Sequence, residues 1–134
     1  MPAADDLIVM YLELASAARK RNRPWDRDKL LVLAGAAAEE RGRHTIASLC
    51  RRRILEHNHG HMIGHYAKVA DALADERFAG YLGQLRRRFS PERCEHMLTL
   101  LRIDARQRLN RYADLNEYAA ATLADETASE GGTG

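Results

Sequence analysis

Apolar side chains recur at intervals of three and four residues along most of this chain, and nowhere do they alternate with polar ones for long. This spacing gathers apolar side chains on one face of an α-helix, whereas a half-buried strand requires alternation. Ala, Leu, Arg and Glu dominate the composition and are strong helix formers, while β-branched and aromatic residues are few. The sequence therefore predicts an all-α protein.

Capping residues and helix breakers divide the chain into six or seven expected helices. We expect these helices to stack as antiparallel helical hairpins in one compact bundle. The predicted helical stretches run from Asp5 to Arg21, from Asp26 to Gly42, from Thr45 to Asn58, from Met62 to Leu73, from Asp75 to Phe89, from Ser90 to Leu101, and onward from the caps Asp104 and Asp114.

A chain of 134 residues is too short for two hydrophobic cores, so we expect a single helical domain over residues 1–126. Residues 127–134 are rich in Gly, Thr and Ser, and we expect a disordered tail there. The predicted core consists of apolar positions that share one face of the expected helices, namely Leu33, Leu49, Ile54, Tyr66, Val69, Leu82, Leu85, Met97, Leu98 and Leu101.

The longest apolar stretch, from Leu30 to Ala38, is about half as long as a membrane crossing requires. The N-terminus carries Asp5 and Asp6 and shows no secretory signal. Two cysteines, Cys50 and Cys94, are too few for a disulfide scaffold. We therefore expect a cytoplasmic protein with free thiols, without a membrane span, and without a cofactor.

Four of the six histidines fall within nine residues. If the helix continued through them, His57, His61 and His65 would align, and two histidines at i and i+4 can share one metal ion. Gly60 and Gly64 indicate a break at the same place, and neither an HExxH nor a paired CxxC pattern is present. Metal binding by these histidines is therefore an alternative to roles in a turn, in packing, or in a pH-sensitive contact.

Charge is distributed unevenly along the chain. Residues 1–111 hold all 21 basic residues, whereas residues 112–134 hold five acidic residues and no basic one. Arginine triplets at residues 51–53 and 86–88 could contact phosphates, so nucleic-acid binding is a second alternative. Three consecutive helical residues fan out around the axis, however, and ordinary ion pairs on solvated faces explain the same composition.

The sequence contains no nucleophile motif and no phosphate-binding glycine loop, so we expect a protein that is not an enzyme. The function predicted first is a non-catalytic module that binds an unidentified protein partner. The segment from Leu115 to Leu123 carries a short apolar stripe and is expected to dock, either on its own body or on a second copy in a homodimer. Candidate interaction residues are Leu115, Tyr118, Leu123, Arg52 and Arg87.

Overall fold

The computed structural model describes the backbone of residues 4–131 and the side chains of residues 5–124. Within these residues all regular structure is helical, which confirms the all-α prediction. The elements are α1 (Ala4–Lys20), α2 (Pro24–Glu40), α3 (His44–His57), the 3-10 helix η1 (Met62–His65), α4 (Val69–Leu73), α5 (Glu76–Arg88), α6 (Pro91–Leu101), α7 (Ala105–Leu109) and α8 (Leu115–Gly131). None of the described helices is long and apolar enough to cross a membrane.

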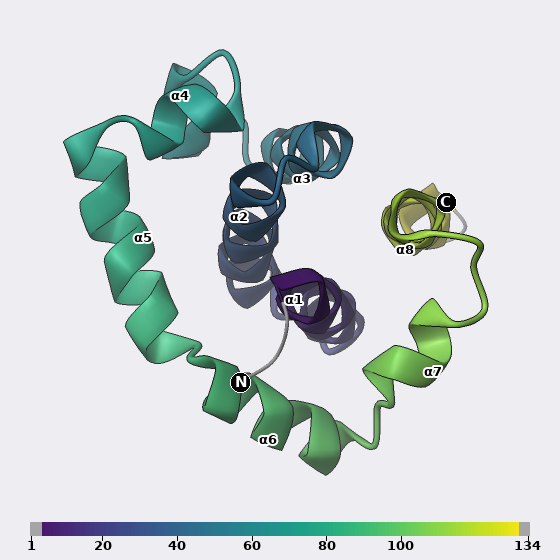
Figure 1. The fold of residues 1–134 in the computed structure, drawn as a ribbon. Helices are drawn as coiled ribbons and strands as arrows, with labels where there is room; N and C mark the ends of the chain where they lie inside the picture. The colour runs from purple at the N-terminus through teal and green to yellow at the C-terminus, as the bar shows by residue number, and fades with distance from the viewer. Residues whose placement is uncertain (1–3, 132–134) are drawn as a thin grey trace.

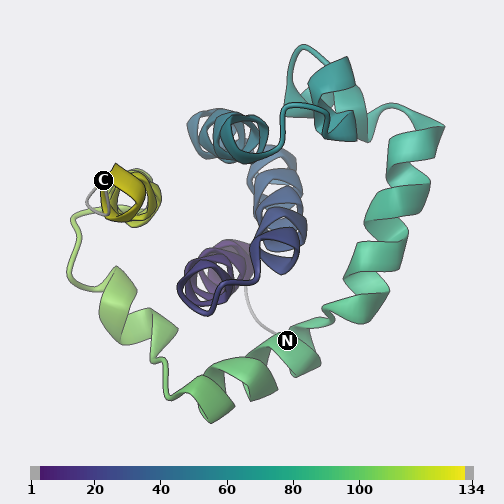
Figure 2. The same cartoon turned by 180° about the vertical axis from the view of Figure 1, so that it is seen from behind.

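The helices form a central group and a surrounding belt (Figure 1). Three-residue connections join α1 to α2 and α2 to α3, and each of these pairs packs extensively. The shorter helices α4 to α7 curve around this group, and α8 closes the arrangement by packing against both α1 and α3 (Figures 1 and 2). The first three helices therefore form hairpins, and the remainder of the chain wraps around them.

The central position of α1 and α2 follows from side chains that are apolar on nearly every face. All residues from Ile8 to Ala15 are buried, as are all residues from Leu30 to Ala36. A helix that is apolar all around is stable only when it is covered on all sides. At Gly35 of α2, a Cβ atom would lie 3.3 Å from the Cβ of Cys50, so α3 approaches the α2 backbone closely.

Local capping signals located several helix starts correctly. Asp75 accepts a hydrogen bond from the backbone N of Arg77, and Ser90 accepts one from Arg93 at the start of α6. Asp104 and Asp114 accept from residues three positions later, Gln107 and Glu117, as the capping-box spacing predicts. The C-terminal third therefore contains two separate helices, as expected.

Two other predicted starts were wrong, the N-cap of the second helix by three residues and the start of the third helix by one. The second helix begins at Pro24 with Arg23 at its N-cap, so Asp26 lies inside the first turn, where a carboxylate favours the positive helix end. The third begins at His44 rather than Thr45. In both cases the helix starts without a hydrogen bond from a capping side chain, so a capping residue in the sequence does not mark its start.

The predicted helix from Met62 to Leu73 was wrong. The chain instead forms the 3-10 helix η1, passes through an extended segment at Tyr66 and Lys68, and resumes as the short helix α4. Gly64 allows close packing here, because a Cβ at this position would lie 3.0 Å from Leu55 Cδ2. The apolar spacing of Met62, Tyr66 and Val69 imitates a helical stripe, but the glycines decide the backbone.

The core contains all ten predicted residues, at two levels of burial. Six are buried, and Leu49, Tyr66, Met97 and Leu101 are partly buried against them. The sequence pattern missed how much of the core α1 would supply. The predicted disorder of residues 127–134 stays a prediction: residues 132–134 lie outside the described part of the chain, while the helical backbone of α8 continues to Gly131.

Candidate functional site

The three histidines proposed as metal ligands do not form a row. His57 is the last residue of α3, the chain leaves the helix at Asn58, and His61 and His65 belong to the turn that follows. The Nδ1 atom of His61 accepts a hydrogen bond from the backbone N of Ile63, 3.0 Å away. Among the described residues, no group of three or more His, Cys, Asp or Glu side chains is arranged to hold a metal ion.

His57 has a structural partner that the sequence did not reveal. Its Nδ1 lies 2.9 Å from Oδ2 of Asp28, a residue of α2 that is only 2% exposed. The other oxygen of Asp28 accepts a hydrogen bond from Arg27 Nη1 at 2.9 Å, and the same nitrogen donates to the carbonyl of Arg53. The network fixes the end of α3 against α2, because a buried carboxylate must have its hydrogen bonds satisfied.

Aromatic side chains surround this network. The ring of Trp25, which is 64% exposed, meets the His57 ring edge-on at a centroid distance of 6.0 Å. The rings of His61 and Tyr81 are similarly placed at 6.2 Å. Burial lowers the pKa of His61, which favours the neutral ring that its accepted hydrogen bond requires.

The segment containing Leu115, Tyr118 and Leu123 docks on the body of its own chain. All three side chains of this segment are buried, and α8 packs against α1 and α3. The hydroxyl of Tyr118 donates to Oε2 of Glu13 over 2.6 Å, and Oε1 of Glu13 lies 2.8 Å from Arg108 Nε. These residues therefore serve the fold, and in this structure they are not available to a partner.

Ion pairs between distant helices involve several of the arginines. Arg86 of α5 pairs with Glu40 of α2 at 2.6 Å, and Arg43 pairs with Asp5 at 2.8 Å. Arg52 and Arg87, the proposed interaction residues, are exposed, and neither has an acidic partner among the described side chains. The structure does not bring these two arginines together, since Arg52 lies on α3 and Arg87 on α5.

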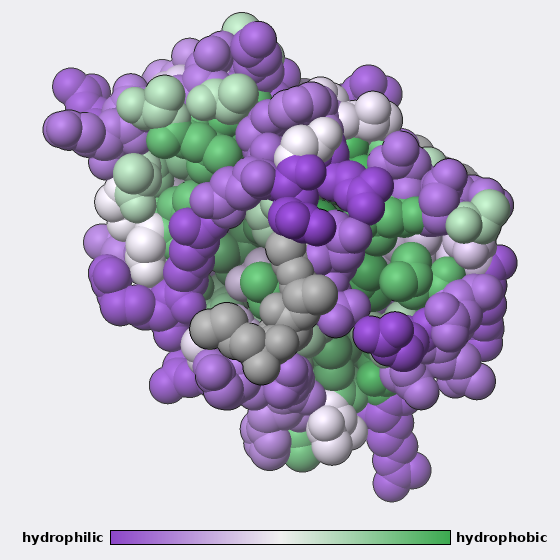
Figure 3. All heavy atoms as spheres, in the orientation of Figure 1, coloured by the Kyte–Doolittle hydropathy of each residue, from purple (hydrophilic) through white to green (hydrophobic). Residues whose placement is uncertain are grey.

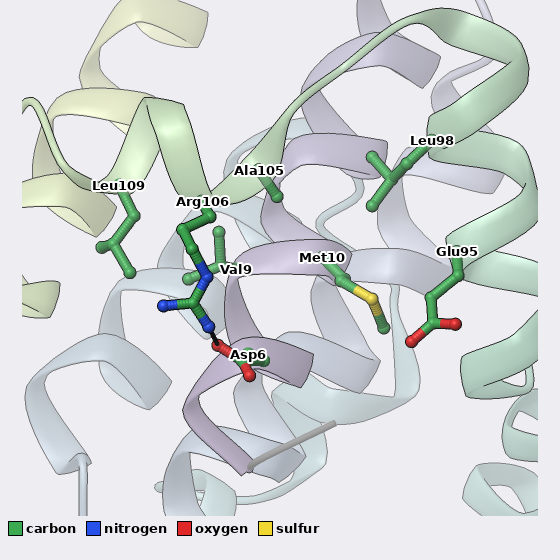
Figure 4. A pocket seen from close by; sticks show the side chains of 8 residues that line it. All are labelled: Asp6, Val9, Met10, Glu95, Leu98, Ala105, Arg106 and Leu109. Carbon is green, nitrogen blue, oxygen red and sulfur yellow. Dashed lines mark hydrogen bonds and ion pairs between the residues drawn. The ribbon is translucent and has the colours of Figure 1, made fainter. Parts of the chain in front are cut away.

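Figure 4 shows a pocket of about 430 Å³ between α1, α6 and α7. Apolar side chains such as Met10 and Leu98 line it, and an ion pair of 3.4 Å between Asp6 and Arg106 crosses one side. Asp6 and Arg106 pair with each other, so Glu95 is the charged side chain in the lining that has no ionic partner among the described residues. The pocket therefore offers an apolar surface and one carboxylate, that of Glu95, outside the ion pair.

A second hollow, which we call the apolar groove, lies between the end of α1, the start of α2, and α6. Its cavity volume is about 240 Å³, and its lining consists of Leu14, Ala17, Ala18, Leu30, Phe89, Met97, Leu100 and Leu101, with Arg21, Arg23 and Asp26 at the rim. Leu100 is 68% exposed, which is unusual for a leucine in a chain that buries most of its large apolar side chains. This groove lies at the end of the bundle where α1 joins α2; Figure 2 shows the backbone of that connection.

Next to the apolar groove lies a hollow that we call the basic pocket. The two share Ala17, and the basic pocket has a volume of about 290 Å³ between α1 and the segment that leads into α7. Lys20, Arg102 and Arg111 line it without a carboxylate partner among the described residues. Two carboxylates also line it: Glu13 pairs with Arg108, and Asp104 accepts a hydrogen bond from the backbone N of Gln107. Arg102 holds a left-handed backbone with φ of 59° as the C-cap of α6, a position that glycine usually occupies.

Figure 3 shows the face of the molecule seen in Figure 1, where hydrophobic side chains lie in hollows between hydrophilic ones.

Comparison of the chain with models of protein families, with curated proteins and with solved structures found no match.

Proposed function

We propose that the protein is a non-catalytic interaction module and that its apolar groove binds an amphipathic helix of a partner protein. The observation that carries this proposal is the exposed Leu100 beside an apolar floor, with unpaired cations around it. Small-molecule sites usually enclose about 300–1,000 Å³, and the groove encloses less. Its size suits one or two apolar side chains that project from a helix.

Charge complementarity indicates the character of the partner. Arg21 and Arg23 at the rim, and Lys20, Arg102 and Arg111 in the basic pocket, have no ionic partner among the described residues. The one rim carboxylate, Asp26, lies 3.8 Å from Arg88 and is compensated. A helix with apolar residues on one face and carboxylates beside them would satisfy both halves of this surface, and electrostatic attraction would favour it over a basic helix.

Selection of peptides tests the proposal. A displayed library of helical peptides of about 16 residues, long enough for isolated helices to form, is selected on the immobilised full chain. We expect enriched sequences with apolar residues at i, i+3 or i+4, and i+7, flanked by Asp and Glu. Their affinity should fall at least about tenfold with Leu100→Glu, and also with Arg21→Glu combined with Arg23→Glu.

Arg52→Glu is the matched control, because it reverses an equally exposed charge on α3, away from the groove. It should leave the affinity of the selected peptides unchanged. If no acidic amphipathic sequence is enriched, or if the enriched peptides bind the Leu100→Glu protein as tightly as the original, the groove is not a helix-binding site.

A further inference from the structure

A fourth hollow, which we call the α3 pocket, lies between α3 and the turn that follows it. Its volume is about 360 Å³, and it shares no lining residue with the apolar groove or the basic pocket. Arg51 and Arg52 of α3 and Lys68 from the turn line it, together with His59 and Leu55. The broken helix at the histidines thus places a lysine beside two arginines that precede it by 16 or more positions.

The guanidinium of Arg51 is held in one position by the backbone. Its Nε and Nη2 atoms donate to the carbonyl oxygen of Tyr66 over 3.1 and 2.7 Å. A guanidinium has five N–H donors, so others remain for a ligand. Since the bond partner is a neutral carbonyl, the positive charge of Arg51 is positioned without being neutralised.

The other positive charges in the lining of the α3 pocket are also not neutralised by a carboxylate. Arg52 and Lys68 are exposed, and within the described part of the chain neither of them pairs with a carboxylate. The carboxylate in the lining, Glu56, lies 2.7 Å from Arg53 Nη1 and is compensated by it. Three uncompensated cations around one hollow produce a local positive potential that attracts anions.

Close packing at Gly64 explains how the backbone brings these charged residues to one hollow. It lets η1 pack against Leu55, and the turn then carries the Tyr66 carbonyl to Arg51 and Lys68 to the rim. Leu55 and Ala67 add an apolar patch to the lining. The α3 pocket therefore combines fixed positive charge with room for a small apolar group, within the usual volume of small-ligand sites.

We infer that the α3 pocket binds a phosphate monoester of a small molecule, with the phosphate held by Arg51, Arg52 and Lys68. Arginine suits this ligand because its planar group matches two phosphate oxygens at once. A nucleic-acid backbone would instead need cations that follow a strand over several phosphates, whereas these three line a single hollow.

NMR titration of the full chain with inorganic phosphate and with glycerol 3-phosphate tests this inference. The Nε–H signal of Arg51 should shift with both, and glycerol 3-phosphate should bind more tightly. Arg52→Gln and Lys68→Gln should each weaken binding by about tenfold, the loss expected for one charge-assisted hydrogen bond. Arg87→Gln, which removes an exposed arginine on α5, is the control and should leave the affinity unchanged.

Circular dichroism of each variant checks that the fold is retained. Arg51→Lys gives a second test, because lysine keeps the positive charge but lacks the guanidinium that donates two hydrogen bonds to the Tyr66 carbonyl. This variant should also bind phosphate more weakly. The inference is overturned if neither phosphate shifts the Arg51 signal, if Arg52→Gln and Lys68→Gln bind as well as the original, or if a single-stranded RNA binds the α3 pocket and glycerol 3-phosphate does not displace it.

Discussion

Removing one oxygen atom from Tyr118 should measurably destabilise the protein. The ring of this residue is fully buried in α8, and its hydroxyl donates over 2.6 Å to Glu13, which is only 4% exposed. A hydrogen bond to a charged group contributes about 1.5–3 kcal/mol net, and leaving an oxygen of Glu13 without its donor adds a desolvation cost. We therefore expect Tyr118→Phe to lower the free energy of unfolding by about 2 kcal/mol, and the melting temperature by roughly 8 °C.

Urea unfolding followed by circular dichroism measures this difference, and Tyr112→Phe is the control. The Tyr112 ring packs edge-on against Tyr118 at 5.8 Å, but its hydroxyl has no described hydrogen bond. The control should stay within about 0.5 kcal/mol of the original protein. If Tyr118→Phe costs no more than the control, the bond to Glu13 does not stabilise the fold as argued.

The pH dependence of the same variant provides a second measurement. Burial, and then the Glu13 carboxylate, raise the pKa of Tyr118 above its usual value near 10. Because the folded pKa exceeds the unfolded one, the stability that depends on the neutral hydroxyl is present below about pH 10 and is lost as pH rises further. The stability difference between the original protein and Tyr118→Phe should therefore shrink above pH 10, while the other tyrosines affect both proteins equally. A constant difference up to pH 11 would contradict this reasoning.

Three further predictions concern packing. Deleting residues 114–134 removes α8 and uncovers α1 and α3, so calorimetry should show a lower melting temperature; an unchanged one would mean that α8 is dispensable. Gly35→Ala should cost about 1–3 kcal/mol in urea unfolding because α3 is too close, whereas Gly80→Ala, with open space around it, should be neutral or stabilising. Cys50 and Cys94 are buried, and burial raises the pKa of Cys94 to about 11, so iodoacetamide should label them only as the protein unfolds; rapid labelling in native buffer would contradict their placement.

Local signals predicted the fold class and several boundaries, because caps and breakers act over three or four residues. Ser90 before Pro91, and Asp104 and Asp114, are such signals, and the structure confirms them. The helix expected from Met62 does not form, because the backbone breaks near Gly64 although the apolar spacing of Met62, Tyr66 and Val69 is helical. Periodicity alone does not show whether a backbone close to glycine will continue as a helix.

The candidate sites could not be predicted in the same way, because each combines residues that are far apart in the sequence. The apolar groove joins Ala17 on α1 to Leu100 on α6, and no local pattern relates the two. Arg52, a predicted interaction residue, lines a hollow, but Lys68 reaches the same hollow only through the turn at Gly64. Buried Glu13 also gave no signal, since an acidic residue in an apolar helix resembles an ordinary exposed position until its partners are known.

The packing of α8 against α1 also has a consequence for biosynthesis. Tyr118 follows Glu13 by 105 positions, so the ribosome adds that many residues before the contact can form. At about 5–20 residues per second, α1 waits on the order of 5–20 s without α8, one of the helices that cover it. During this interval the part of its apolar surface that α8 covers is open to chaperones and to aggregation. A codon change that slows translation between α3 and α8 would lengthen this exposure without altering a single side chain.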